Sequence, residues 1–301
     1  MLNLALSKNY ISPQIETGAY EKLWLDQQIT TFKLFNERLK SCRATLPSEV
    51  VSEQEAFKTF QQAANLLNQK LGDEEWGVRV KGTADYPASL EDAEHPLSVF
   101  YYQGMWDLAF TDSVAVVGTR KATKEGEKRT QKIVQWLVEN GYTIASGLAE
   151  GIDTIAHRTA LALGGKTFAV IGTPLCEAYP KSNSGLQQRL AKDFLVISQV
   201  PVLRYYSQSY KINRFFFPER NKTMSALTKA TIIVEAGETS GSLTQADAAF
   251  KQGRKVLILD SCFQNSSLTW PDKYHAKGAI RVKGEEDLER ALGKANAISK
   301  N

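Results

Sequence analysis

The feature that most constrains the fold is a regular alternation of short apolar runs and amphipathic stretches from Ser113 onward. Runs such as 113–117 are β-branched and have the length of buried strands, whereas the stretches between them repeat apolar residues at helical spacing. The predicted strands are residues 113–117, 142–145, 167–171, 194–198, 231–235, 255–259 and 279–282, and the predicted helices are residues 123–139, 152–164, 184–192, 219–229, 240–251 and 285–292. This alternation predicts an α/β fold in which helices cover both faces of a parallel sheet.

The sequence before this region predicts a different organisation. Residues 1–72 are interpreted as helical, because apolar residues recur at three–four spacing on either side of a break at Pro47. We therefore expect a small helical domain over residues 1–75, with a packing role, and an α/β domain over residues 76–301. Val99–Tyr102 is a candidate short strand, and residues 261–278, which lack periodicity, are predicted to form a loop.

Composition excludes several classes of protein. Hydrophobic residues make up 43% and charged residues 23% of the 301 residues, which is a soluble globular profile. No apolar run has membrane-spanning length, and residues 1–8 do not resemble a secretion signal. The three cysteines are far apart and odd in number, and there are three histidines, so we expect neither a disulfide framework nor a metal site. These features predict a cytoplasmic protein without a metal or cofactor.

The net charge of +4 is distributed unevenly. Residues 1–104 contain 10 Lys/Arg and 14 Asp/Glu, a balance of −4, whereas residues 105–301 contain 27 and 19, a balance of +8. The predicted α/β domain is thus the basic part of the chain, which favours a polyanionic partner.

Three predicted strands end in turns of small residues, and each turn is followed by a helix. The turns contain Gly118, Thr119 and Arg120, then Ser146 and Gly147, and then Ser240, Gly241 and Ser242. Unpaired N–H groups at helix starts favour anions, and ligands of parallel sheets bind at the carboxyl ends of the strands. We therefore predict a phosphate-binding cleft at these residues. None of the turns is a standard nucleotide fingerprint, and each glycine is equally compatible with a tight turn and close packing.

Residues 204–229 combine cations with aromatic residues. Lys211, Arg214 and Arg220 lie close to Phe215, Phe216 and Phe217, a composition typical of single-strand binders. We predict that Arg120 and Arg220, the latter at a helix start beside Asn221, contact phosphate. In an extended approach to that helix, Phe215 and Phe217 would share a face directed to the nucleic acid, with Phe216 buried. The alternative is that these aromatic residues are simply core.

Candidate catalytic groups are few. Asp153 and His157 are four residues apart and could pair on a helix, and Glu150 and Glu235 lie near the predicted cleft. A general acid/base role for Glu235 competes with one in which it accepts hydrogen bonds from loop N–H groups. We interpret His157 and Glu235 as structural and predict no catalytic residues.

Several motifs occur together in a defined order over residues 84–260, and they resemble the DprA/Smf family of DNA-processing proteins. The motifs are Tyr86-Pro87, residues 114–120, residues 146–153 with His157, Gly164-Gly165, Tyr179-Pro180, Pro218-Glu-Arg-Asn221 and residues 235–242. The resemblance implies an extended Rossmann fold that binds single-stranded DNA. It also implies a homodimer that protects single strands and loads the RecA recombinase during transformation and recombination. Gly118, Thr119, Arg120, Phe217, Arg220 and Asn221 occupy the positions of the family's binding motifs.

The chain departs from the family pattern at some positions. Thr119 stands where serine is usual, Asp260-Ser261 where Pro-Gly is frequent, and Lys222 where arginine is common. The sequence ends before a C-terminal winged-helix domain, so we expect none. A divergent member could serve genome maintenance or phage defence.

Two other functions suit a Rossmann cleft: hydrolysis of nucleoside monophosphates, as in enzymes of the LOG type, and reception of a nucleotide signal. The turn from Glu235 to Gly241 lacks the glycine run of LOG enzymes, and Gln245 stands nearest to the position of their final glutamate.

Overall fold

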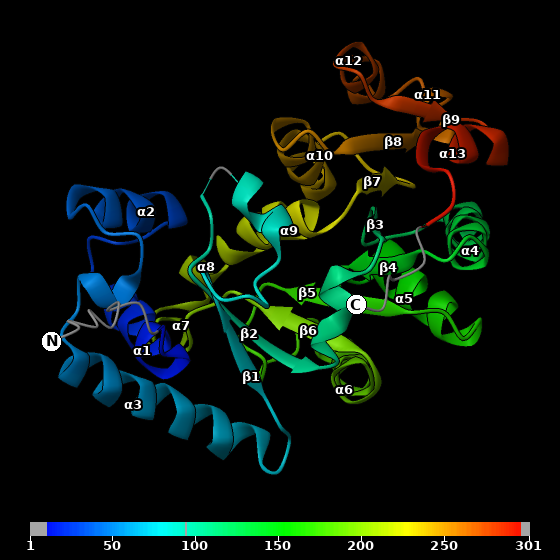
Figure 1. Cartoon of the computed structure of the whole chain (residues 1–301). Helices are drawn as coiled ribbons and strands as arrows, with labels where there is room; N and C mark the ends of the chain where they lie inside the picture. Colours follow the sequence, from blue (N-terminus) through cyan, green and yellow to red (C-terminus); the bar gives the residue numbers. More distant parts are fainter. Residues whose placement is uncertain (1–10, 94, 296–301) are drawn as a thin grey trace, which may run out of the picture.

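A computed structural model describes residues 11–93 and 95–295, and its centre is a nine-stranded sheet of order β1-β2-β6-β5-β4-β3-β7-β8-β9 (Figure 1). The strands are β1 (Gly77–Val80), β2 (Val99–Gly104), β3 (Ser113–Val117), β4 (Thr143–Ser146), β5 (Thr167–Ile171), β6 (Leu195–Ser198), β7 (Ala230–Ile233), β8 (Lys255–Leu259) and β9 (Ile280–Val282). All seven strands predicted after residue 112 are present and run parallel. The α/β fold class is confirmed.

One edge of the sheet differs from the prediction of a wholly parallel sheet. Strand β2, at the candidate strand Val99–Tyr102, pairs antiparallel with β6, and β1 pairs antiparallel with β2. Strand β1 was missed. It has four residues, of which Val80 alone is buried, so its sequence carries no clear alternation. Segments before the alternating region thus extend the sheet at the edge nearest the N-terminal helices.

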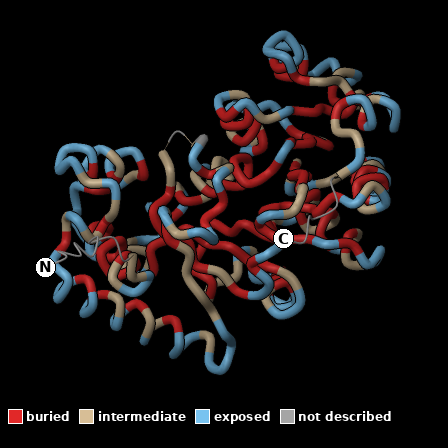
Figure 2. Tube along the Cα trace, in the orientation of Figure 1, coloured by how far each residue is buried: buried red, intermediate tan, exposed pale blue. Residues whose placement is uncertain are grey.

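Helices cover both faces of the sheet. The predicted helices appear as α4 (Lys124–Glu139), α5 (Ile152–Ala162), α6 (Ser184–Asp193), α9 (Phe216–Leu227), α10 (Gly241–Lys251) and α13 (Glu285–Leu292). Strand β3 shows how the faces divide, because Val114 and Val116 belong to a core with α4, α5 and α13, whereas Ala115 and Val117 belong to a core with α9 and α10. In Figure 2 the residues of the central strands are mostly coloured as buried.

The prediction of a loop over residues 261–278 is wrong. The region holds α11 (Asp260–Phe263) and α12 (Trp270–Ala276), and two further short helices, α7 (Val202–Ser207) and α8 (Tyr210–Asn213), precede α9. Helices of four to seven residues are too short to show a repeating apolar pattern. In α12 the usable signal was the pair Trp270 and Tyr274, four residues apart and both buried. Short 3₁₀ helices cover Pro47–Glu49, Ala88–Asp92, Trp106–Phe110 and Lys181–Asn183.

From residue 11 on, the N-terminal region is helical as predicted, with α1 (Pro13–Trp24), α2 (Phe32–Ser41) and α3 (Glu53–Leu71), while residues 1–10 of the predicted region lie outside the described ranges. Its aromatic core is continuous with that of the sheet, since Trp24 contacts Phe32 at 4.8 Å and Phe216 at 6.0 Å between ring centroids. The Tyr20 hydroxyl donates a hydrogen bond to the Gln199 carbonyl. A domain boundary at residue 75 therefore stays a prediction.

Within the described ranges, no helix is both long and apolar enough to cross a bilayer. Over the same residues, no group of three or more His, Cys, Asp and Glu side chains is arranged to hold a metal ion. Residues 1–8, from which a secretion signal was excluded, lie outside the described ranges.

Candidate nucleic-acid interface

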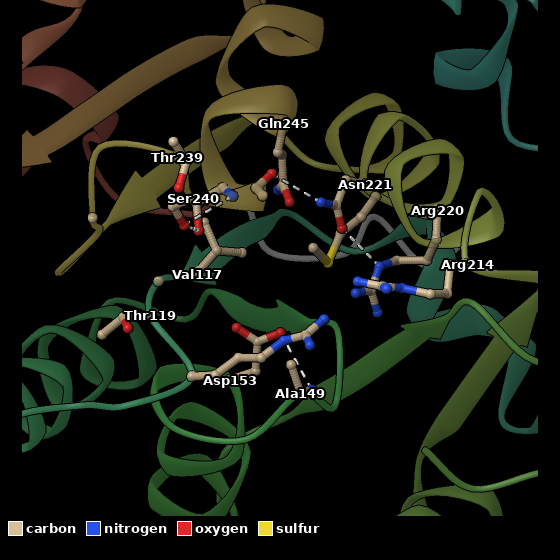
Figure 3. A pocket seen from close by; sticks show the side chains of 16 residues that line it. Val117, Thr119, Ala149, Asp153, Arg214, Arg220, Asn221, Thr239, Ser240 and Gln245 are labelled. Carbon is tan, nitrogen blue, oxygen red and sulfur yellow. Dashed lines mark hydrogen bonds between the residues drawn. The ribbon is translucent and has the colours of Figure 1, made fainter. Parts of the chain in front are cut away.

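A cleft of about 480 Å³ opens at the carboxyl ends of β3, β4 and β7, which are neighbours in the sheet as the sequence predicted. The chain runs from β3 to β4 on one side and returns to β7 on the other, so the cleft lies at a topological switch point, where ligands of open α/β sheets bind. Figure 3 shows Thr119, Ala149 and Asp153 on one wall, Thr239, Ser240, Gln245 and Asn221 on the other, and Arg214 and Arg220 at one end.

The polar groups of the turn after β4 form hydrogen bonds within the protein. The Ser146 hydroxyl is buried and donates to the Val116 carbonyl at 2.7 Å. The Gly147 and Ala149 N–H groups donate to one carboxylate oxygen of Asp153, at 3.1 and 3.4 Å. The Asp153 carboxylate thus accepts from the N–H groups that were expected to face a phosphate, and DNA contacts of Ser146 and Gly147 stay a prediction. Burial raises the pKa of Asp153, while the charge of Arg220 opposes this rise.

The Arg220 side chain is buried and forms its hydrogen bonds within the protein. It lies in the second turn of α9, not at a helix start, and 5% of it is exposed. Its Nη1 donates to the carbonyls of Gly147 and Val170, and its Nε donates to Asn221 Oδ1 at 2.8 Å. Burial lowers the pKa of Arg220 to about 10, an effect that Asp153 counteracts, so the guanidinium is charged at neutral pH. Arg220 therefore joins α9 to β5 and the β4 turn, and the predicted phosphate contact stays a prediction.

The other half of the cleft is open. Arg120 and Arg214 line it with exposed side chains, and neither has an ion pair among the described residues. Helix α10 begins beside them, and its N-cap Ser240 accepts a hydrogen bond from the Ser242 N–H at 3.3 Å. Asn221 fixes this helix start by donating to the Gly241 carbonyl at 3.1 Å. Two cations and the positive end of a helix thus face the same space, an arrangement that favours anions.

Most of the residues predicted to bind DNA line the cleft, and four of them lie outside it. Gly118, Thr119, Arg120, Arg214, Arg220, Asn221, Ser240, Gly241 and Ser242 line the cleft, whereas Ser146, Gly147, Lys211 and Phe217 do not. At Gly118 a Cβ would overlap the Glu235 carbonyl and the Ile152 side chain, so the loop after β3 packs closely against the loop after β7 and the start of α5. Lys211 is exposed on α8, outside the cleft. Gln245, buried in the wall with Nε2 donating to Thr231 Oγ1 at 3.2 Å, was not predicted to bind.

The three consecutive phenylalanines are not in an extended segment, which corrects the predicted sharing of a face. Helix α9 begins at Phe216, so successive side chains point to different sides of the helix axis and do not alternate between two faces. Phe216 is fully buried, as predicted. Phe215 packs on Phe216 and Trp24, at 4.2 and 6.3 Å between centroids, so it joins the core instead of sharing a face with Phe217. Phe217 is half-buried and contacts Tyr179 at 5.2 Å.

The candidate catalytic groups are held in structural positions. Thr167 Oγ1 donates to the Ile144 carbonyl at 2.8 Å, so its contact with His157 Nδ1 at 2.7 Å requires the imidazole to donate. Burial lowers the pKa of His157 to about 3, and the ring is therefore neutral. Glu235 accepts hydrogen bonds from the N–H and hydroxyl of Thr123, at 3.3 and 2.9 Å. These contacts agree with the structural interpretation of both residues.

The mostly parallel sheet and the cleft at its switch point define an α/β protein of the Rossmann type. The chain belongs to the family described as DNA recombination-mediator protein A, whose model matches residues 78–293. The resemblance to the DprA/Smf family is thereby confirmed.

The chain is similar to curated members of this family. It is 41% identical to DNA processing protein DprA of Streptococcus pneumoniae over 174 residues, which cover 58% of this chain and 59% of that protein. It is 37% identical to protein Smf of Synechocystis over 202 residues, which cover 66% of this chain and 47% of that protein. The alignments thus span about half to three fifths of these relatives.

Solved structures agree with the fold. The X-ray structure of DprA from Streptococcus pneumoniae superposes with a TM-score of 0.71 at 29% identity and covers 93% of this chain and 98% of that one. DNA processing protein A from Helicobacter pylori superposes with a TM-score of 0.62 at 25% identity and covers 73% and 96%. The Helicobacter structure was described for its single-stranded DNA binding mode.

Proposed function

We propose that the protein binds single-stranded DNA, with backbone phosphates in the cleft between β3 and α10. The observation that carries this proposal is the position of Arg120 and Arg214 beside the open start of α10, two exposed cations that form no ion pair with any residue that the structure describes. The excess of positive charge in residues 105–301 agrees with a polyanionic ligand. The single-stranded DNA binding described for the Helicobacter relative adds further support.

The salt dependence of binding tests the proposal. Fluorescence anisotropy with labelled oligo(dT) should show affinity that falls steeply with salt, and each lost phosphate contact should make the log–log slope shallower by about 0.7. Arg120→Gln and Arg214→Gln should each weaken binding and reduce the slope. Lys58→Gln, on the exposed surface of α3, is the matched control. Binding that does not depend on salt would contradict the proposal.

We propose that the protein acts without catalysis and without a cofactor. His157 and Glu235 are engaged in internal hydrogen bonds, and Gln245 presents an amide in the cleft wall where a carboxylate would be needed for general acid/base chemistry. The alternatives, hydrolysis of nucleoside monophosphates and reception of a nucleotide signal, require a mononucleotide to occupy the cleft. A thermal-shift panel of free nucleotides compared with oligo(dT) separates these functions.

In the cell, we propose a homodimer in the cytoplasm that protects single strands and presents them to the RecA recombinase. The family description as a recombination mediator supports this role. We further propose that residues 1–75 form a helical unit beside the DNA-binding part. Sedimentation of the full chain tests the dimer, and RecA filament assembly on strands coated by another single-strand-binding protein tests the mediator role. A monomer, or unchanged assembly kinetics, would contradict the respective proposal.

A further inference from the structure

Two tyrosines beside the cleft expose their rings, although aromatic rings of this size are usually more deeply buried. Tyr210 on α8 is 53% exposed, and Tyr179, in the loop after β5, is 38% exposed. Their ring centroids are 6.1 Å apart, with a 50° angle between the planes. We call these two residues the tyrosine pair. They come from segments 31 positions apart in the chain, so the fold itself brings them together.

Phe217 packs against one member of the tyrosine pair, Tyr179. It contacts Tyr179 at 5.2 Å between ring centroids, and a Cβ added to Gly172 would overlap the Phe217 ring, so this ring lies directly on the backbone after β5. Phe217 is therefore held between the sheet and Tyr179. Tyr179 and Tyr210 are more exposed than Phe217 and are therefore more accessible to a ligand.

The tyrosine pair borders the cationic part of the cleft. Arg214 lies four residues after Tyr210 and lines the cleft together with Arg120. Tyr210 is the first residue of the single-turn helix α8, and Arg214 is the C-cap of that helix, so the two side chains leave the same turn of backbone. A ligand with phosphates at the arginines would extend its uncharged parts over the tyrosine pair.

We propose that Tyr179 and Tyr210 form a stacking site for the bases of a single strand whose phosphates are bound at Arg120 and Arg214. This inference rests on the proposed function and adds the tyrosine pair to it as a base-contacting surface, while a base contact of Phe217 stays a prediction. A stacking site of this kind accepts any base, because every base has a π-face, so binding would not depend on sequence.

Tyr206 on α7 provides a matched comparison within the same segment. It is also partly exposed, at 37%, but its hydroxyl donates to Glu177 at 2.7 Å and Lys70 Nζ lies 4.5 Å from its ring centroid. One face of that ring is therefore covered by a cation from α3. A base could not stack on that face, so Tyr206 is expected to have no part in binding.

The experiment compares Tyr210→Ala, Tyr179→Ala and Tyr206→Ala on two ligands, oligo(dT) and an abasic strand with the same number of phosphates. Tyr210→Ala and Tyr179→Ala should each weaken oligo(dT) binding by about 5- to 150-fold, the loss of one stacked base, and leave abasic binding unchanged. The salt slope should not change, because no phosphate contact is lost. Tyr210→Trp should retain binding, and Tyr206→Ala should leave both affinities unchanged.

Three results would overturn the inference: equal losses on both ligands, an effect of Tyr206→Ala as large as that of Tyr210→Ala, or unchanged oligo(dT) binding in the Tyr210 variant. Tyr210→Ala decides the question even if Tyr179→Ala does not fold, because the exposed Tyr210 ring contributes little to the core.

Arg120→Gln is the reference for the proposed function itself. If it has no effect on either ligand, the cleft does not hold phosphates and the proposed function fails; if it weakens both while the tyrosine variants change nothing, this inference fails alone.

Discussion

The Arg220 guanidinium leaves no room for a side chain at Gly147: it donates to the Gly147 carbonyl, and a Cβ on residue 147 would overlap it. The same Nη1 reaches the Val170 carbonyl at 2.7 Å, so one side chain from α9 satisfies backbone groups at the ends of β4 and β5. Asp153, which receives the N–H groups of the same turn, supplies a nearby opposite charge. This arrangement fixes the closed half of the cleft.

Removing the guanidinium should therefore cost stability. We expect Arg220→Met to lower the free energy of unfolding by about 3–5 kcal/mol, because two buried carbonyls lose their donor and Asp153 loses its neighbouring cation. Urea denaturation measures this loss, and Arg214→Met, at an exposed position, should be nearly neutral in the same assay. A variant at position 220 that is as stable as the wild type but binds DNA weakly would instead support the direct phosphate contact predicted from the sequence.

The two rings at the start of α9 should behave differently. Phe216 is fully buried against Trp24 and Phe32, so Phe216→Ala should cost about 3–5 kcal/mol as a core truncation. Phe217 is half-buried over Gly172, and Phe217→Leu, which keeps an apolar contact there, should cost less than about 1.5 kcal/mol. Thermal melts of both variants test this order, which would be contradicted by a larger loss for Phe217→Leu.

Glu21 should make stability depend on pH. It is fully buried in α1 and accepts hydrogen bonds from the N–H groups of Val202 and Leu203, at 2.6 and 2.9 Å, and from the Tyr101 hydroxyl. Burial raises its pKa to about 7, against the lowering by these hydrogen bonds. The folded state thus holds the proton more tightly than the unfolded state does, and the stabilisation is complete below the unfolded pKa and is lost as pH rises through 7.

Comparison with Glu21→Gln isolates this contribution. The wild-type free energy of unfolding should fall between pH 4.5 and 7 relative to that of the variant, by about 1.4 kcal/mol for each unit of pKa difference. Denaturation of both proteins at a series of pH values measures the difference. Parallel stability curves for the two proteins would show that Glu21 titrates normally.

The protein should release no free base from nucleoside monophosphates and should not cut DNA strands. His157 is neutral and bound to Thr167, and Glu235 is bound to Thr123, so neither is free to transfer a proton in the cleft. Chromatography after prolonged incubation with a nucleotide panel tests this expectation. Base release that disappears in Glu235→Gln would establish an enzyme instead.

The sequence predicted the parts of the fold that depend on local pattern. Seven parallel strands and the turn beside Arg120 followed from apolar runs and small residues, since strand period and turn chemistry are properties of neighbouring positions. The pairing of Arg220 with Gly147 did not follow, because those residues are 73 positions apart and meet through tertiary packing. Asp153 was considered as a partner of His157, whereas its hydrogen bonds to the Gly147 and Ala149 N–H groups depend on how the turn folds back.

The aromatic segment shows the same limit. A run of three phenylalanines indicates burial or stacking, but the direction of each ring depends on whether the backbone is extended or helical, and helix α9 begins one turn earlier than its apolar pattern suggested. Tyr210 could be recognised as part of an exposed aromatic pair only from the structure, because α8 and Tyr179 meet through tertiary packing.

Residues 199–229 connect β6 on one side of β3 to β7 on the other, and they contain Tyr210, Arg214 and Arg220. The start of this connection is fixed by Tyr20 and Glu21 of α1 and its end by Arg220, so α7 and α8 form a span held at both ends. Such a span can gain or lose residues without changing the register of any strand. The width of the aromatic surface can therefore vary among related proteins, or be altered by design, while Arg120 and the start of α10, which lie outside the span, keep their positions.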